Sequence, residues 1–417
     1  MAPRWLILAD DLTGAADCAI AFARRGFAAA VSWGEPPDGA AKAAVASYNA
    51  DSRGMTAEQA ARRHRAALGS LFRPHHALFK KIDSTLRGQP AAETGATLAF
   101  LRERVGAAFG IFAPAFPATA RTTVGGRILV GGRPLEEAEV WRREHSYARA
   151  DLVEALASAN VAAEAVPLPV IRSDGDELRS ALAAIAGRGR DVAVCDAETD
   201  EDLRRIALAS LPARAGAFFI GSAGLAHAIA SVLPAEIGEP PPWARSKRGF
   251  LIVVGSLAAV SRKGLRKLAA LGDVTHVTVE PRTLLDEPEG RAALGRSVTS
   301  LIDSGRDVLV EVHMNEAPDM ALGPRLAAGL ADALAPAAPH MSGFAATGGE
   351  TAAALLARFG VNGIRLFDEI EPGVALGLTL GALSIPVVTK AGAFGDEDSL
   401  VRIAKRLHDI RTKGTPA

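Results

Sequence analysis

Short apolar runs alternate along the whole chain with longer stretches rich in alanine and leucine. The runs have the length of buried strands, and the stretches between them have the length of helices. Because this alternation is typical of parallel βαβ units, the sequence predicts an α/β fold with mainly parallel sheets and flanking helices. The strands predicted in the first half are 5–9, 28–31, 43–47, 77–81, 107–113, 192–195 and 217–220. Those predicted in the second half are 250–254, 274–279, 307–312, 343–347, 363–367 and 386–389.

Two segments interrupt this pattern. Residues 122–134 contain two glycine pairs, which are typical of the turns of a β-hairpin. Residues 236–249 are proline-rich, charged and aperiodic, which favours a linker. We therefore expect two α/β domains, 1–235 and 250–417, joined by the linker 236–249, with the active site in the cleft between the domains.

Length and composition narrow the class of protein. A chain of 417 residues is too long for one ordinary core, and its 49% apolar and 23% charged residues are those of a water-soluble globular protein. The number of lysines and arginines equals the number of aspartates and glutamates. The chain therefore lacks the surplus of positive charge that would favour a nucleic-acid partner. No apolar run approaches the length of a membrane helix or a signal-peptide core, so we expect a cytoplasmic protein without a membrane partner. Cys18 and Cys195 lie in apolar contexts and are expected to be buried, unpaired thiols.

The first candidate site follows the first predicted strand, where Asp10 and Asp11 precede a Thr-Gly turn and an Ala-rich helix. Open α/β sheets bind ligands outside the carboxyl ends of their strands, so both carboxylates are placed for chemistry. The alternative is that the two residues only cap the following helix. The local sequence leaves both interpretations open.

A second polar cluster, Lys80–Gly88, follows the strand residues 77–79. It combines two lysines, a carboxylate, two hydroxyls and an arginine, a set that suits a small polyhydroxy acid better than a helix cap does. A third loop, after the strand at 107–113, adds Arg121 and Thr122 as weaker candidates for the same anion site. A solvated capping turn is the structural alternative for the 80–88 cluster.

The second half of the chain carries three glycine-bearing turns, each after a predicted strand: 255–256, 347–351 and 390–395. Glycines allow close backbone approach to phosphate, and a helix start behind them offers N–H groups. Together these turns favour a nucleotide-phosphate site, although the sequence has neither a GxxxxGK[ST] loop nor a GxGxxG fingerprint. HExxH, CxxC and GxSxG are absent too, and the acidic turn lacks the Asp-x-Asp spacing of haloacid-dehalogenase phosphatases.

These motifs together resemble the four-carbon acid sugar kinase family. The resemblance rests on Asp10–Ala15, Lys81–Gly88, Gly348–Thr351 and Glu369–Gly373, which occur in the family's order over essentially the whole chain. It implies an N-terminal domain that binds a sugar acid, a C-terminal domain that binds ATP, and phosphate transfer to the terminal hydroxyl of threonate or erythronate. Mg²⁺ is expected with ATP, with Glu350 or water completing its shell.

The resemblance also implies site residues. Those for the sugar acid are Asp10, Asp11, Lys81, Asp83, Ser84, Thr85, Arg87, Arg121 and Thr122. Those for ATP are Ser256, Thr347, Gly348, Gly349, Glu350, Gly392 and Gly395. Either Asp83 or Asp11 is the candidate base at the attacking hydroxyl.

Two segments depart from the family's pattern. The Gly-Ser turn continues with Leu257-Ala258-Ala259-Val260-Ser261 in place of Cys-Ser-Pro-Val-Thr, and Leu135–Asp151 differs as well. The second departure bears on the preferred acid, so a 3-oxo-tetronate or another small hydroxy acid stays an alternative substrate. A sensor that binds the acid without catalysis is the non-enzymatic alternative. Whether the protein forms a homo-oligomer is open.

Overall fold

The computed structural model describes residues 4–212, 215–255, 258–313, 322–392 and 394–414. These divide into two compact units. Unit 1 comprises the described residues of Met1–Ala29 and Ala43–Gly238, and unit 2 comprises Ala30–Lys42 with the described residues of Glu239–Ala417. The chain passes between them inside the proline-rich segment 236–249. Nothing in the sequence pattern had separated Ala30–Lys42 from the rest of the first half.

Unit 1 is built on a parallel sheet. Its strand order is β3 (Val45–Asn49), β1 (Arg4–Ala9), β4 (His76–Lys81), β11 (Ala217–Gly221), β5 (Phe109–Ala113), β10 (Val192–Cys195) and β9 (Ala163–Val166). Every neighbouring pair in this order is parallel, so the carboxyl ends of these strands lie at one edge. The α/β prediction is confirmed here; β9 was not predicted.

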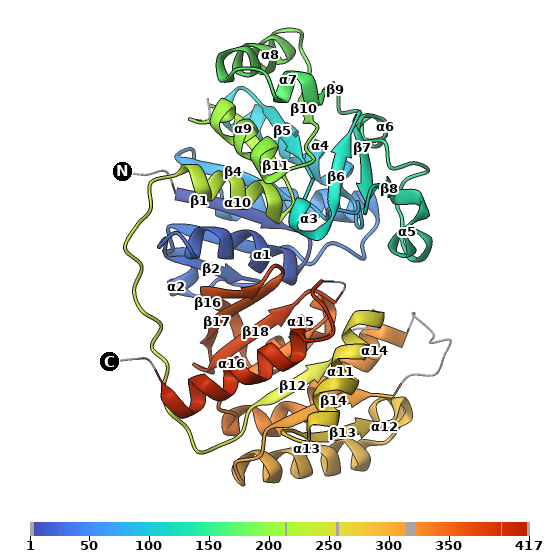
Figure 1. Ribbon diagram of the computed structural model, residues 1–417, viewed down its shortest axis with the longest axis vertical. Helices are drawn as coiled ribbons and strands as arrows, with labels where there is room; N and C mark the ends of the chain where they lie inside the picture. Colours follow the sequence, from blue (N-terminus) through green and yellow to red (C-terminus); the bar gives the residue numbers. More distant parts are fainter. Residues whose placement is uncertain (1–3, 213–214, 256–257, 314–321, 393, 415–417) are drawn as a thin grey trace. The chain divides into compact units, whose positions relative to one another are not determined.

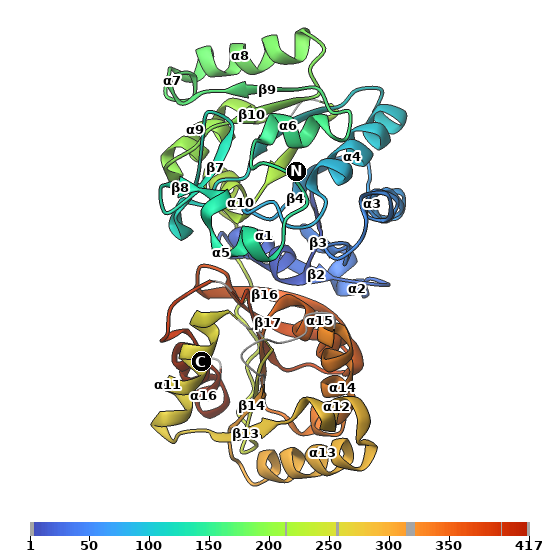
Figure 2. The ribbon, with the colours of Figure 1, turned by 90° about the vertical axis from the view of Figure 1, so that its right-hand side faces the viewer.

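Helices cover both faces of this sheet, as Figures 1 and 2 show. On one face lie α1 (Leu12–Ala23), α10 (Ala223–Val232) and α9 (Asp200–Ser210). On the other lie α3 (Ala57–Leu71), α4 (Pro90–Val105) and α6 (Leu152–Ala157). The shorter or peripheral helices are α5 (Glu139–Arg143), α7 (Leu168–Ile171) and α8 (Gly175–Gly187).

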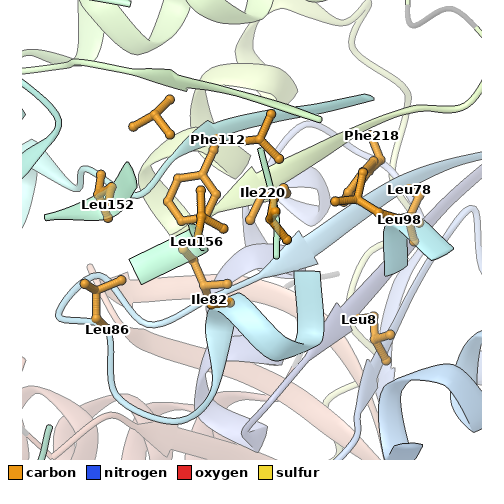
Figure 3. Packing of buried hydrophobic residues seen from close by; sticks show 14 of the residues in the cluster. Leu8, Leu78, Ile82, Leu86, Leu98, Phe112, Leu152, Leu156, Phe218 and Ile220 are labelled. Atoms are coloured by element: carbon orange, nitrogen blue, oxygen red, sulfur yellow. The ribbon is translucent and has the colours of Figure 1, made fainter. Parts of the chain in front are cut away.

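A large apolar core fills the space between the sheet and the second group of helices (Figure 3). Side chains of the strands, such as Leu8, Leu78 and Phe112, meet Leu98 of α4. The core continues past the end of β4 through Ile82 and Leu86, which are both 1% exposed. These two side chains attach the polar 81–88 loop to the apolar core, because burial of one aliphatic side chain stabilises the folded state by about 1.5–3 kcal/mol.

The predicted hairpin is confirmed as a small antiparallel sheet of β6 (Arg121–Val124), β7 (Arg127–Val130) and β8 (Arg133–Pro134). Gly125 and Gly126 turn the chain with φ of 60° and 71°, the left-handed geometry of a two-residue hairpin loop. The carboxylate of Asp196 accepts hydrogen bonds from both glycine N–H groups, at 2.6 and 2.9 Å.

Unit 2 carries a mixed sheet. Its order is β13 (Thr275–Val279), β14 (Val308–Val312), β12 (Leu251–Val254), β15 (Phe344–Thr347), β18 (Pro386–Lys390), β17 (Val374–Gly381), β16 (Val361–Glu371) and β2 (Ala29–Ser32). The first five are parallel, and β17 pairs antiparallel with both β18 and β16. The sequence pattern missed β17, whose glycines weaken the strand signal. A Pro-Gly turn at Gly373, with φ of 82°, joins β16 to β17.

Helices cover both faces of this sheet too (Figure 2). One face carries α11 (Ala259–Leu271) and α16 (Ser399–Lys413), and the other carries α12 (Pro281–Asp286), α13 (Pro288–Asp303), α14 (Gly323–Leu334) and α15 (Gly349–Arg358). The short α2 (Asp38–Ala41) contacts β16. In the described part of the chain, every helix is too short or too polar to cross a membrane.

Candidate active site

Three charged segments of unit 1, one acidic and two with a cation, meet at the carboxyl ends of its strands. Asp10 directly follows β1, Lys81 ends β4, and Arg53 follows β3, so neighbouring strands bring the three together. Arg53 Nε donates to Asp10 Oδ2 at 2.7 Å, and Lys81 Nζ lies 3.4 Å from Asp10 Oδ1. The loop that carries Arg53 is also tied by its backbone, since the N–H groups of Ser52 and Arg53 both donate to the Asp10 carbonyl.

Asp11 has two roles at once. It is the N-cap of α1, where its side chain accepts from the Gly14 N–H at 3.1 Å and from the Thr13 hydroxyl at 2.6 Å. It also receives Nη1 and Nη2 of Arg53, both at 3.0 Å, and Nζ of Lys81 at 3.1 Å. The capping interpretation of the acidic turn is therefore confirmed for this residue, while its role at a ligand stays a prediction.

Gly14 makes room for the lysine. A Cβ at this position would lie 2.0 Å from Nζ of Lys81 and 2.5 Å from Oδ1 of Asp11. Only glycine lets the first turn of α1 approach the ammonium this closely. The Thr-Gly sequence after the acidic pair thus serves the ion-pair cluster as well as the helix start.

The 81–88 loop folds around Asp83. Its Oδ1 accepts from the N–H of Thr85 at 2.9 Å and from the Thr85 hydroxyl, and its Oδ2 accepts from Arg87 at 2.7 Å. Arg53 Nη2 lies 3.5 Å from the same Oδ2. The structure therefore joins the two polar segments that the sequence had singled out separately.

The local charges keep these carboxylates ionised. Burial alone would raise the pKa of Asp10 and of Asp11, but Arg53 and Lys81 outweigh it and lower both below 3.8. Burial opposes the charge of Asp83 too, yet Arg87 and Arg53 hold its pKa well below its usual value. Carboxylates so strongly paired with cations are weak proton acceptors at neutral pH, and they serve better as oriented hydrogen-bond acceptors.

The remaining residues expected at the sugar acid lie nearby or in the hairpin. Ser84 is buried in the 81–88 loop, and Arg121 and Thr122 begin β6. Burial lowers the pKa of Arg121 while Asp83 raises it, an electrostatic interaction that links the hairpin to the loop. In the described part of the chain, Thr122 pairs with Leu129 of β7 and makes no hydrogen bond with the cluster.

Arg53 is the residue of this site that sequence reasoning missed. Its guanidinium contacts Asp10, Asp11 and Asp83, so it is the centre of the cluster. One signal was available: an Asp-Ser-Arg run follows the predicted strand at 43–47 within a few residues. A polar run at the carboxyl end of a parallel strand indicates a candidate site after β3 just as it does after β1 and β4.

In unit 2, the predicted glycine turns gather at the ends of β12, β15 and β18. Gly348, with φ of 90°, is the N-cap of α15, and its N–H donates to the Lys390 carbonyl at 3.0 Å. Thr347 and Lys390 are register partners at the last positions of β15 and β18. Gly349 and Glu350 open α15 behind that turn.

The third turn packs against α11 and α16. The Ser261 hydroxyl of α11 donates to the Gly392 carbonyl at 2.8 Å. Gly395 has a φ of 78°, and a Cβ there would lie 2.1 Å from the Ser399 hydroxyl and 2.4 Å from Oε1 of Glu371. Glu371, from the Glu369–Gly373 segment, thus lies beside this loop. Ser256 lies outside the described residues.

Lys390 stands out among the turns of unit 2. It is 1% exposed, and Nζ reaches only the hydroxyl of Ser261 at 3.4 Å and the carbonyl of Ala391 at 3.3 Å. Within the described residues no carboxylate lies within ion-pair distance of it. Burial lowers its pKa to about 8, despite the more distant Glu371 and Asp396. Sequence reasoning had noted this residue only as part of a glycine turn.

Comparison with known families defines the class of protein first. Residues 5–229 match the family model of a sugar-binding N-terminal domain, and residues 251–400 match that of a nucleotide-binding C-terminal domain. The chain is thus a two-domain protein with a sugar-binding and a nucleotide-binding part.

Similar proteins narrow the class. The chain is 42% identical to a D-threonate kinase from Cupriavidus necator, over 95% of this chain and 96% of that protein. It is 32% identical to a D-threonate kinase from Bordetella bronchiseptica, over 97% and 98%. A D-erythronate kinase from Heliobacterium modesticaldum is 29% identical, over 94% of each chain. The chain belongs to the four-carbon acid sugar kinase family, which confirms the resemblance.

Solved structures agree on the fold. A crystal structure from Salmonella typhimurium LT2 has a TM-score of 0.79 at 21% identity and covers 96% of this chain and 98% of its own. Another, from Haemophilus influenzae, has a TM-score of 0.72 at 20% identity, over 96% and 99%. At these identities the likeness shows the α/β fold alone.

Proposed function

We propose that this protein transfers the γ-phosphoryl group of ATP, bound with Mg²⁺, to the terminal hydroxyl of D-threonate. Membership of the four-carbon acid sugar kinase family makes it a kinase of a four-carbon sugar acid. One observation carries the choice of D-threonate: the 42% identity, over nearly the full length of both chains, to a protein named for that activity. Relatives named 3-oxo-tetronate kinase are 26–28% identical.

The ion-pair cluster of unit 1 supports a site for a small hydroxy acid. Arg53, Lys81 and Arg87 supply three cations, and Asp10, Asp11 and Asp83 supply three carboxylates. The cations suit the carboxylate of the acid, and the carboxylates together with Ser84 and Thr85 suit its hydroxyls. An incoming hydroxy acid can exchange partners with this preformed set, because its hydroxyls donate to the carboxylates while its own carboxylate shares the cations with them.

The turns of unit 2 support a site for the nucleotide phosphates. The first turn of α15, which begins at Gly349 and Glu350, offers backbone N–H groups, and the glycines of the 390–395 turn favour close approach. In this proposal Lys390 supplies the cation, because its ammonium is buried without a carboxylate partner within ion-pair distance in the described residues. Glu350, in the first turn of α15, fits Mg²⁺, which keeps several waters and needs only one or two protein carboxylates beside phosphate oxygens. Thr347, Gly349 and Ser256 stay predicted contacts.

The transfer needs orientation more than a strong base. The oxygen of the terminal hydroxyl forms a bond to the γ-phosphorus as the bond to the bridging oxygen of ADP breaks, and the hydroxyl proton passes late in the step to the carboxylate that accepts its hydrogen bond. Asp11 or Asp83 accepts a hydrogen bond from the attacking hydroxyl and aligns it. Their lowered pKa values suit this role, because the transition state is loose and little proton transfer is needed early.

A substrate panel tests the proposal. The purified protein would be incubated with ATP, Mg²⁺ and each of D-threonate, L-threonate, D-erythronate, L-erythronate and 3-oxo-tetronate, with coupled detection of ADP. Mass spectrometry and ³¹P NMR would identify the product and the phosphorylated carbon. We expect the largest kcat/KM with D-threonate and phosphate on C4.

Other outcomes would be informative. A tenfold preference for an erythronate or for 3-oxo-tetronate would reassign the acceptor within the family. Binding of an acid by calorimetry without any phosphoester would favour the sensor and contradict the kinase. Omitting Mg²⁺ in the presence of a chelator is the control for the metal, and it should abolish turnover.

A further inference from the structure

A buried polar cluster lies directly behind the cations of unit 1. It consists of Ser52, His64 of α3, Lys80 of β4 and Glu93 of α4, and each of the four is at most 1% exposed. Lys80 Nζ lies 2.8 Å from Oε2 of Glu93, while Oε1 of Glu93 accepts from the Ser52 hydroxyl at 2.7 Å and lies 3.1 Å from Nε2 of His64. Every carboxylate oxygen of Glu93 is therefore engaged.

Two members of this cluster are adjacent in the sequence to the cations of the candidate site. Ser52 precedes Arg53, and Lys80 precedes Lys81. Successive side chains of a strand point to opposite faces, so Lys81 faces Gly14 of α1 while Lys80 faces Glu93 of α4. Lys80 Nζ also donates to the backbone carbonyl of Lys81, which ties the buried amine to the residue that carries the site cation.

Glu93 is the residue that joins these parts. It lies in the first turn of α4, the helix that follows the 81–88 loop, and it contacts the segments that carry Arg53 and Lys81. Burial opposes its charge, but Lys80 and His64 hold the pKa of Glu93 well below 4.5. Burial and Lys80 lower the pKa of His64, and its Nε2 lies 2.9 Å from the Ser52 hydroxyl and 3.1 Å from Oε1 of Glu93. One buried negative charge thus contacts both the segment after β3 and the end of β4, the strands on either side of β1.

We propose that Glu93 is a positioning residue for the sugar acid: through Lys80 and Ser52 it fixes the backbone from which Lys81 and Arg53 reach the acid. The inference rests on the proposed function, because it assumes that these two cations meet the acceptor. Glu93 touches neither substrate. Its loss would change the placement of the site cations, and with it the affinity for the acid, more than the affinity for ATP.

The substitution Glu93→Gln tests this, because it keeps the shape of the side chain and removes its charge. We expect KM for D-threonate to rise at least tenfold, while KM for ATP and kcat at saturating acid stay within threefold of wild type. Asp202→Asn is the matched control: Asp202 is also a buried acid in an early helical turn of unit 1, paired with Arg172 at 2.9 Å, but makes no hydrogen bond or ion pair with the described residues of the site. It should lower thermal stability without changing KM for D-threonate.

Two further variants keep the test decisive if Glu93→Gln folds poorly. Ser52→Ala removes one hydrogen bond to Glu93 and should give a smaller rise in the same KM. The double variant Lys80→Met with Glu93→Gln leaves no buried unpaired charge, so it should regain stability but keep the raised KM. A KM for D-threonate within twofold of wild type in folded Glu93→Gln, or recovery of KM with stability in the double variant, would overturn the proposal.

A structural readout separates this inference from the proposed function. If the wild-type protein phosphorylates no acid in the panel, the proposed function fails while the positioning role is still measurable. Crystal structures of wild-type and Glu93→Gln protein would then be compared. Displacement of Arg53 and Lys81 away from Asp10 and Asp11 supports the positioning role, and unchanged ion pairs contradict it.

Discussion

At the residue scale, the cations and carboxylates of the proposed sugar-acid site in unit 1 neutralise one another. Arg53 is buried among three carboxylates, and burial, which alone would lower its pKa, is outweighed by Asp10, Asp11 and Asp83, which raise it. Removing one partner from such a buried set leaves an uncompensated charge, a change that typically costs about 3–5 kcal/mol. Variants here therefore need a readout that distinguishes lost chemistry from lost folding.

Asp83→Asn and Arg87→Ala should each lose most of the turnover. Asp83 orients Thr85 and Arg87 by hydrogen bonds, so its neutral replacement loosens the loop and exchanges one of the two acceptor oxygens for an amide donor. We expect kcat/KM for the acid to fall by roughly 100-fold or more. ATP binding, measured by calorimetry, should survive because the nucleotide contacts lie in unit 2. Wild-type rates in either variant would remove the 81–88 loop from the active site.

Lys390 gives a pH dependence on the nucleotide side. Its amine loses the proton as pH rises through about 8, so the cation proposed for the phosphates disappears on the alkaline side. The wild-type kcat/KM for ATP should fall above pH 8, since this parameter reports the free enzyme. Lys390→Arg should remove that alkaline fall, because a guanidinium stays charged, and Lys390→Met should be low at every pH. An unchanged alkaline fall in Lys390→Arg would assign the titration to another group.

At the element scale, the start of α1 combines capping with ion binding. Asp11 caps the helix, and Gly14 leaves the space that the Lys81 ammonium occupies. The usual preference for alanine over glycine inside a helix is therefore reversed at this position by a neighbouring strand.

Gly14→Ala should fold but bind the acid poorly. Its methyl group would displace the flexible end of Lys81, which breaks the lysine's contacts with Asp10 and Asp11. We expect a rise in KM for the acid with little loss of helix content. Gly69→Ala in α3 is the control, since a Cβ there meets nothing within 4 Å; it should leave KM unchanged and raise stability by up to about 1 kcal/mol. Equal KM values in the two variants would refute the steric argument.

At the scale of the whole molecule, the two units differ in the burial of the acidic side chains whose pKa values are lowered. In unit 1, Asp10, Asp83 and Glu93 are buried, Asp11 is half-buried, and all four have lowered pKa values. Among the described residues of unit 2, the acids with lowered pKa values are Glu239 and Asp396, which are exposed, and Asp409, which is half-buried. Exposed pairs contribute little to stability because water screens them.

Acid should therefore destabilise unit 1 first. A carboxyl whose pKa is lower when folded contributes stability that is complete above its unfolded value, here 3.8 to 4.5, and is lost as pH falls through the folded value. Urea unfolding between pH 7 and pH 3 would be followed by tryptophan fluorescence. A Trp33→Phe/Trp243→Phe protein reports unit 1 through Trp5 and Trp141, and the reciprocal double variant reports unit 2. Parallel losses in the two units would contradict the argument.

Much of the fold was accessible from the sequence because strands of parallel sheets are continuous apolar runs. The acidic turn and the 81–88 loop were found because polar clusters directly follow such runs. Arg53 and Glu93 were not found: the arginine lies four residues past β3, and the glutamate looks like an ordinary early-turn helix acid. Strand β17 escaped because Gly377 and Gly381 dilute its apolar pattern.

The sequence by itself determined the α/β class, the order of the polar loops and the family, since all three depend on local periodicity and on motifs read along the chain. Tertiary structure alone decided which charges meet. Asp10, Arg53 and Lys81 are separated by dozens of residues, and only the adjacency of β3, β1 and β4 brings them within hydrogen-bonding distance. Burial, too, is a property of the folded chain, and it turns Lys80, Glu93 and Lys390 from common charged residues into interior ones. The local sequence pattern specifies the helices and strands. Which charged side chains form ion pairs depends on distances that only the packing of those elements determines.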